Sequence, residues 1–110
     1  MDLLIKEYKR VAAVQPKGRL DSNTAPELEA ALTKLQIDGR THIVLDLSEI
    51  EFLSSAGLRV MVSTMKNLRK TGGELAVASP NSRAREVLRL AGLDSVFSVY
   101  ETREAAIASV

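Results

Sequence analysis

Two adjacent serines, Ser54 and Ser55, stand where a predicted strand has ended and a helix begins. Ala56 and Gly57 follow them, and these small side chains leave the serine hydroxyls accessible to another molecule. A serine at a helix start commonly accepts a hydrogen bond from an amide of the first turn, which is the plain structural interpretation. The same position also suits phosphorylation, because free amides and the positive end of the helix dipole stabilise a phosphate by about 0.3–1 kcal/mol.

Other residues with chemical potential lack the partners that catalysis would need. A serine hydrolase would require Ser55, His42 and Asp46 to converge, but their spacing does not indicate this and no Gly-x-Ser-x-Gly motif is present. One histidine without cysteine cannot build a usual zinc site, so we interpret His42 as structural. Glu49 and Glu51 are interpreted as solvated loop residues. We therefore expect no catalytic residue, no metal site and no cofactor.

The composition of the 110 residues favours one small domain with an aliphatic core. Hydrophobic residues make up 45%, with two Phe, two Tyr and no Trp. The 15 basic and 14 acidic residues are interspersed, which argues against nucleic acid or an anionic membrane as partner. The apolar runs are too short for a membrane helix, and no signal-peptide core is present. These patterns predict a cytoplasmic domain over residues 1–110, a monomer by default.

Hydrophobic periodicity predicts strands that alternate with helices. The first half is expected to contain a hairpin over 3–16, a polar loop over 18–23 and a helix that begins with a capping box of Thr24 and Glu27. A strand over 42–47, a loop over 48–54, a helix over 55–70 and a strand over 74–78 follow. The last elements are a helix opened by Ser79 and Pro80 and ended at Gly92, a strand over 96–100 and a terminal helix capped by Thr102. The order ββαβαβαβα predicts an α/β fold, a small mixed β-sheet flanked by about four α-helices.

Several motifs follow one another along the chain. A strand ends in Asp-Leu-Ser at residues 46–48, and Ile-x-Phe-Leu-Ser-Ser-Ala-Gly-Leu-Arg follows at 50–59. After a helix come Gly72-Gly73, another strand and Leu-x-x-Ala-Gly-Leu at 88–93. Together they resemble the STAS domain of bacterial anti-sigma factor antagonists, and the similarity extends from the first hairpin to the terminal helix.

The resemblance implies partner switching. The domain would bind an anti-sigma factor that is also a serine kinase, and so release a sigma factor. The kinase, which binds the ATP, would phosphorylate Ser55, and a phosphatase would restore the binding form. Ser54 stands where the family often has Asp, and Ala56 where it often has Ser or Thr, so Ser54 is a competing acceptor. The expected partner-binding residues are Asp21, Ser22, Asn23, Thr24, Ser54, Ser55, Ala56, Gly57, Leu58 and Arg59.

Two other classes of function are also compatible with the sequence. STAS domains also serve as adaptors or regulatory subunits of anion transporters, lipid-transport complexes and stress-signalling assemblies, some of them without phosphorylation. The weaker alternative is a small nucleotide-binding or nucleotide-hydrolysing enzyme. Against that enzyme stand the missing phosphate-binding loop and the missing metal ligands, because Gly72-Gly73 has the context of a helix end rather than of a phosphate loop.

Overall fold

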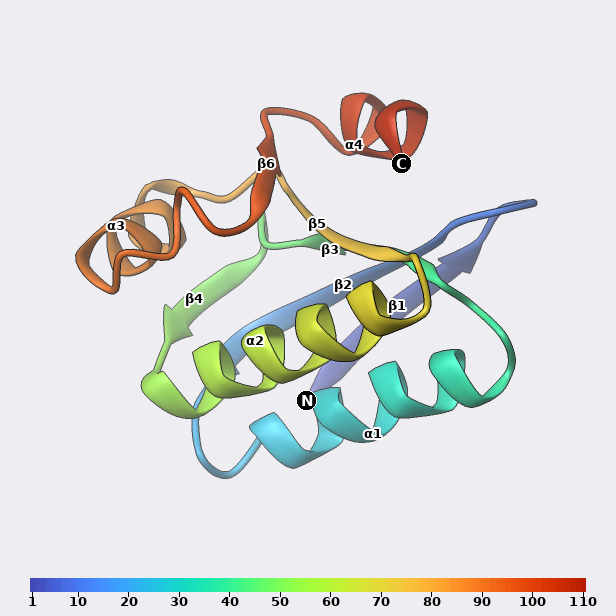
Figure 1. Cartoon of the computed structure of the whole chain (residues 1–110). Helices are drawn as coiled ribbons and strands as arrows, with labels where there is room; N and C mark the ends of the chain where they lie inside the picture. Colours follow the sequence, from blue (N-terminus) through green and yellow to red (C-terminus); the bar gives the residue numbers. More distant parts are fainter.

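The computed structural model, which describes residues 1–110, combines one mixed six-stranded sheet with four helices (Figure 1). The elements follow one another as β1 (Asp2–Glu7), β2 (Ala12–Leu20), α1 (Ala25–Ile37), β3 (His42–Asp46), β4 (Ile50–Leu53), α2 (Ser55–Lys70), β5 (Glu74–Ala78), α3 (Ser82–Leu90), β6 (Ser98–Tyr100) and α4 (Arg103–Ser109). The expected mixed α/β fold with four helices is confirmed.

Strand β2 is the longest strand and organises the sheet. It pairs antiparallel with β1 along one side, and the sheet order is β1-β2-β3-β5-β6. On its other side, residues 12–14 pair in parallel with β3, whereas residues 18–20 pair in parallel with β4. The register shifts between Gly18 and Arg19, and Gly18 has φ +92°, a conformation that only glycine adopts at little cost. The far half of β2 thus leaves β3 and joins β4.

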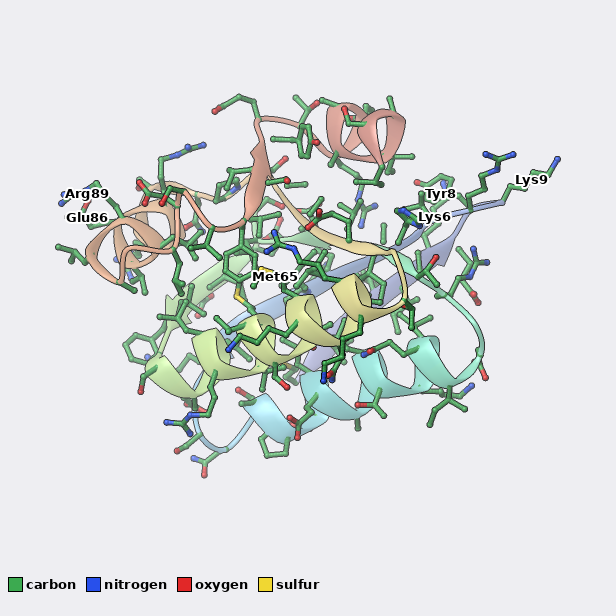
Figure 2. The ribbon with its side chains drawn as sticks, viewed as in Figure 1. Lys6, Tyr8, Lys9, Met65, Glu86 and Arg89 are labelled. Atoms are coloured by element: carbon green, nitrogen blue, oxygen red, sulfur yellow. The ribbon has the colours of Figure 1, made fainter.

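The two faces of the sheet are covered unequally. Helices α1 and α2 lie side by side on one face (Figure 1), and together with Ala84 and Leu88 of α3 they belong to a core cluster of 21 buried residues. Met65 belongs to this cluster and points inward from α2 (Figure 2). The opposite face carries a second cluster of only six residues, which α4 covers with Ala106. Successive residues of β2 alternate between the two clusters, since strand side chains point to opposite faces.

Two expectations about strands were wrong. Residues 50–53 were predicted to be loop, but they form β4, because Ile50 and Leu53 are buried and their backbone pairs with β2. The observed order is therefore ββαββαβαβα. The hairpin strand was expected to end near Pro16, yet β2 continues to Leu20. Pro16 is tolerated because it lies between the residues of β2 that pair with β3 and those that pair with β4, where its missing N–H breaks neither ladder.

Two predicted helix starts were also wrong in detail. Thr24 makes no capping hydrogen bond to α1. Its hydroxyl donates to the carbonyl oxygen of Arg19 at 2.7 Å, while Glu27 binds the N-terminal ammonium group at 2.7 Å.

Helix α3 begins at Ser82 and is capped by Asn81, whose side chain accepts a hydrogen bond from the amide of Ala84, so Ser79 and Pro80 precede the helix. The cap of α4 by Thr102 is confirmed, with the amide of Ala105 as donor at 3.1 Å.

Candidate functional site

The ends of β2 and β4 bring two distant segments of the chain together. In the parallel register Leu20 lies opposite Leu53, and the amide of Ser54 donates a hydrogen bond to the carbonyl oxygen of Leu20 at 2.9 Å. The carboxyl ends of neighbouring parallel strands lie at the same edge of a sheet. The turn over residues 21–24, which follows β2, therefore stands beside the N-terminal turn of α2, which follows β4.

The two serines at this junction have different environments. Ser54 is the N-cap of α2 with extended backbone dihedrals, but its hydroxyl oxygen is buried and has neither a capping bond nor any other hydrogen-bond partner. Ser55 is the first residue of the helix and is exposed. No acidic residue lies in the first turn of α2, so nothing there offsets the positive end of its dipole. Of the two serines, only Ser55 is an exposed residue.

Gly57 fixes how closely α2 approaches the sheet. A Cβ atom at this position would lie 2.7 Å from Cγ of Leu20 and 3.0 Å from Cδ1 of Leu53. Those distances are too short for carbon atoms in contact, and Leu20 is fully buried. Glycine therefore lets the first turn of α2 pack directly on the ends of β2 and β4, which positions Ser55 relative to the neighbouring turn.

The turn from Asp21 to Thr24 is held by its own side chains. Oδ1 of Asp21 accepts hydrogen bonds from the amides of Asn23 at 3.0 Å and Thr24 at 3.2 Å. Desolvation alone would raise the pKa of Asp21, but these bonds, together with the Thr24 hydroxyl and Arg19, outweigh it and hold the pKa below its ordinary value. Asp21 and Thr24 are thus engaged within the turn, while Ser22 and Asn23 are exposed.

A groove of about 400 Å³ joins the turn to the helix. It lies between α1 and α2, and its lining residues are Ser22, Ala25, Pro26, Glu29, Ala56, Arg59, Val60 and Ser63. Three residues expected from the sequence to bind a partner, Ser22, Ala56 and Arg59, meet in this groove. Of the other expected residues, Leu58 is half-buried and Gly57 is buried, so Gly57 offers backbone and packing rather than a side chain.

Residues 2–106 match the family model of the STAS domain. The chain belongs to the STAS domain family. It is 40% identical over 93 residues to BtrV of Bordetella bronchiseptica, provisionally named an anti-sigma factor antagonist; the match covers 84% of this chain and 80% of BtrV. A crystal structure of an anti-sigma factor antagonist from Mycobacterium paratuberculosis shares 34% identity and a TM-score of 0.90, over 99% of this chain and 92% of that one. These similarities confirm the family and the fold expected from the sequence motifs.

A more distant STAS structure is available in two chemical forms. The unphosphorylated form of the anti-sigma factor antagonist SpoIIAA aligns with a TM-score of 0.84 at 21% identity, over 96% of this chain and 93% of that one. The phosphorylated form of the same protein, from Bacillus, aligns with a TM-score of 0.78 at 21% identity and covers 97% of each chain. At this identity the likeness concerns the fold, which both forms of SpoIIAA share with this STAS domain.

Sequence reasoning missed one exposed pair at the edge of this STAS site. The guanidinium carbon of Arg19 lies 4.2 Å from the ring centroid of Phe52, whose side chain is 40% exposed. Arg19 also approaches Asp21, with Nε 3.7 Å from Oδ2. The pair was missed because Phe52 was assigned to a loop, so its neighbour across the β2–β4 ladder was not apparent. The only signal in the sequence was an apolar residue at each end of the four-residue segment 50–53.

The structure separates the residues that a serine hydrolase would have required. His42 and Asp46 lie at opposite ends of β3, about 13 Å apart by strand rise. Nδ1 of His42 is paired with the hydroxyl of Thr41 at 3.0 Å, and Oδ1 of Asp46 accepts from the amide of Ser48 at 2.9 Å. No cluster of three or more His, Cys, Asp or Glu side chains could hold a metal ion. None of the four helices is long and apolar enough to cross a bilayer.

Proposed function

We propose that this STAS domain is an anti-sigma factor antagonist whose binding is controlled by phosphorylation of Ser55. Unmodified, it binds an anti-sigma factor and thereby frees a sigma factor. The names of BtrV and of the Mycobacterium paratuberculosis protein support the class of partner. The proposed contact surface consists of the turn Asp21–Thr24 and the first residues of α2, Ser54–Arg59.

The observation that carries this proposal is the contrast between the two serines. Ser55 is exposed, and so are Ser22 and Asn23 in the turn that follows β2. The hydroxyl of Ser54 is buried, so a kinase would have to unfold the start of α2 to reach it. Ser55 is therefore the acceptor, and Ser54, the competing acceptor by sequence, is not.

A phosphate on Ser55 changes the surface without rearranging the fold. It adds about −1.5 to −2 charges at pH 7. Burying that charge against a partner without a matching cation costs several kcal/mol, and a loss of about 3 kcal/mol already weakens binding more than a hundredfold. One modified hydroxyl inside the contact is thus sufficient to end the complex.

The chemistry of the cycle belongs to the partners. The anti-sigma factor acts as the serine kinase and binds the ATP, and a separate phosphatase removes the phosphate. The STAS domain supplies the acceptor hydroxyl and the docking surface and carries out no reaction itself. The absence of sequence motifs for phosphate or metal binding, and the separation of His42 from Asp46, support this division of roles.

The test combines phosphate mapping with affinity. The purified chain is incubated with the anti-sigma kinase from the same genome and ATP, and the modified residue is located by mass spectrometry. We expect phosphate on Ser55, normal binding but no modification of Ser55→Ala, and binding at least tenfold weaker for Ser55→Asp. Ser54→Ala is the matched control and should bind and be phosphorylated like wild type. Equal affinity of wild type, Ser55→Ala and Ser55→Asp would rule out the switch and favour an adaptor role without phosphorylation.

A further inference from the structure

A continuous stripe of side chains runs along one face of α2, beginning at Ser55. Spacings of three and four residues place its members on one side of the helix. They line a shallow groove of about 520 Å³, here called the α2 groove, which consists of Ser55, Leu58, Arg59, Val62, Ser63, Lys66, Asn67 and Lys70. Leu58 and Val62 are half-buried against the core, whereas the polar members are exposed. The groove therefore combines an apolar strip with three cationic side chains.

The charge of this helix is one-sided. Helix α2 contains four of the 15 basic side chains of the chain and none of the 14 acidic ones. The rest of the chain consequently carries three more acidic than basic side chains. Arg69 is paired with Glu74 at 3.5 Å, but Arg59, Lys66 and Lys70, the three cations of the α2 groove, form no ion pair. Three uncompensated positive charges thus follow Ser55 along one helix face.

We propose that the α2 groove binds an acidic, partly apolar segment of the anti-sigma factor, so that the docking surface extends from Ser55 to Lys70. This inference rests on the proposed function, because it names the chemistry of the partner that binds there. The charge pattern argues for an anionic occupant, and the strip of Leu58 and Val62 argues for apolar side chains beside its carboxylates. Arg59 lines both this groove and the one between α1 and α2, which makes the two surfaces continuous.

A protein segment fits the groove better than a membrane does. Interfacial membrane helices insert large apolar side chains, usually aromatic ones, into the lipid. The α2 groove offers only Leu58 and Val62, both half-buried. Nor does the chain carry the excess positive charge that anionic lipid binding uses, since its formal net charge is +1. The groove therefore matches the polarity of an acidic, partly apolar peptide segment.

The same geometry gives phosphorylation a second effect. Ser55 and Arg59 lie four residues apart on the groove, within the range at which helical side chains interact. A phosphate at the head of the groove reduces its charge from three positive charges to about one, given about −1.5 to −2 charges per phosphoserine. The phosphate therefore repels the acidic segment and also occupies Arg59, the cation nearest to it. Repulsion of the acidic segment and loss of a free Arg59 both favour release of the partner.

Association kinetics at two salt concentrations test this proposal. The probe is the purified anti-sigma kinase from the same genome, and the variant is Lys66→Gln with Lys70→Gln, which keeps two good helix formers. We expect its association rate constant to fall at least about fivefold at low salt and to approach that of wild type near 0.5 M salt, because steering between exposed charges is screened. Replacement of both lysines by Glu should enlarge the effect. Thermal melting verifies that α2 stays folded.

The matched control removes two charges elsewhere. Lys9, at the exposed tip of the first hairpin (Figure 2), and Lys17, on β2, lie outside the α2 groove. Lys9→Gln with Lys17→Gln should associate within about twofold of wild type. If the Lys66 and Lys70 variants bind like this control while Ser55→Asp still weakens binding, the groove proposal is overturned and the Ser55 switch stands.

Three further outcomes are informative. Failure of wild type to bind the kinase overturns the proposed function, and the groove proposal with it. Co-sedimentation with phosphatidylglycerol vesicles that is lost in the Lys66 and Lys70 variants, with unchanged kinase binding, assigns the groove to a membrane and overturns the protein partner. Weakening that is equal at both salt concentrations shows that packing, not charge, carries the contact, and overturns the acidic segment.

Discussion

Leu20 holds the start of α2 twice, through its carbonyl oxygen, which accepts from the amide of Ser54 at 2.9 Å, and through its side chain, which lies directly beneath Gly57. The residue is fully buried at the end of β2, more than 30 positions before the helix that it supports. Because both contacts act on the first turn of α2, the position of the Ser55 hydroxyl depends on a strand that is remote in sequence.

Gly57→Ala should destabilise the domain. A new Cβ at 2.7 Å from Cγ of Leu20 forces a shift of packed atoms, and such overpacking costs about 1–3 kcal/mol. Alanine returns about 1 kcal/mol of helix propensity, so the net loss in the free energy of unfolding is up to about 2 kcal/mol. Urea denaturation measures this change. In a Leu20→Ala background the loss should be smaller, because only the 3.0 Å contact with Leu53 remains, whereas an undiminished loss would show that Leu20 is not the residue that clashes.

Ser54→Ala should leave the domain as stable as wild type or up to about 1 kcal/mol more stable, because the buried hydroxyl has no hydrogen bond to lose. This reverses the usual loss of about 1 kcal/mol at an N-cap serine. The contrasting variant is Asn81→Ala, which removes the cap of α3 and the bond that Nδ2 of Asn81 donates to the carbonyl oxygen of Ile50. Asn81→Ala should cost about 1–2 kcal/mol by thermal or urea unfolding. A comparable loss for Ser54→Ala would mean that its hydroxyl is bonded in solution.

Sequence patterns predicted the local elements of this fold well. The bounds of α2 and β5 agree to the residue, because α2 combines an apolar face with a glycine pair at its end and β5 is a short apolar run before Ser79. Residues 50–53 gave no such signal. Only Ile50 and Leu53 are buried, and what makes this segment a strand is its pairing with β2, a contact that no local pattern contains.

In the candidate site, too, local sequence patterns predicted some features and long-range contacts decided the others. The motif around Ser54 and Ser55 located the junction, but it could not decide which hydroxyl is exposed. That choice depends on the ladder between β2 and β4 and on the packing of Gly57, both of which are long-range. The capping box failed for a related reason, because Arg19 and the N-terminal ammonium group offered Thr24 and Glu27 partners that lie outside the helix.

Arg103→Ala should destabilise the attachment of α4. Nε of Arg103 lies 3.3 Å from Oδ2 of Asp46, whose side chain is only 7% exposed, yet it makes no well-directed hydrogen bond, so the contact is mainly Coulombic. Removing the cation leaves a buried carboxylate that still binds Gln15 and the amide of Ser48. We expect a loss of about 2–3 kcal/mol in the free energy of unfolding. This is less than the loss expected when a buried charge keeps no partner at all. In an Asp46→Asn background the loss should shrink to below about 1 kcal/mol, and equal losses in both backgrounds would contradict a charge interaction.

Stability should fall at acidic pH in part through Asp21. The amides of Asn23 and Thr24 hold the pKa of this carboxyl below its ordinary value of 3.8, against the opposing effect of desolvation. A group whose pKa is lower in the folded than in the unfolded chain stabilises the fold above the unfolded value, and this contribution is lost as the pH falls through the folded value. Asp21→Asn keeps an oxygen acceptor for both amides but does not titrate, so its urea midpoint should change less than that of wild type between about pH 6 and pH 3. Asp21→Ala, which loses the acceptor as well, should be less stable than Asp21→Asn at both pH values. Parallel pH curves for wild type and Asp21→Asn would show that the charge of Asp21 plays no part in acid stability.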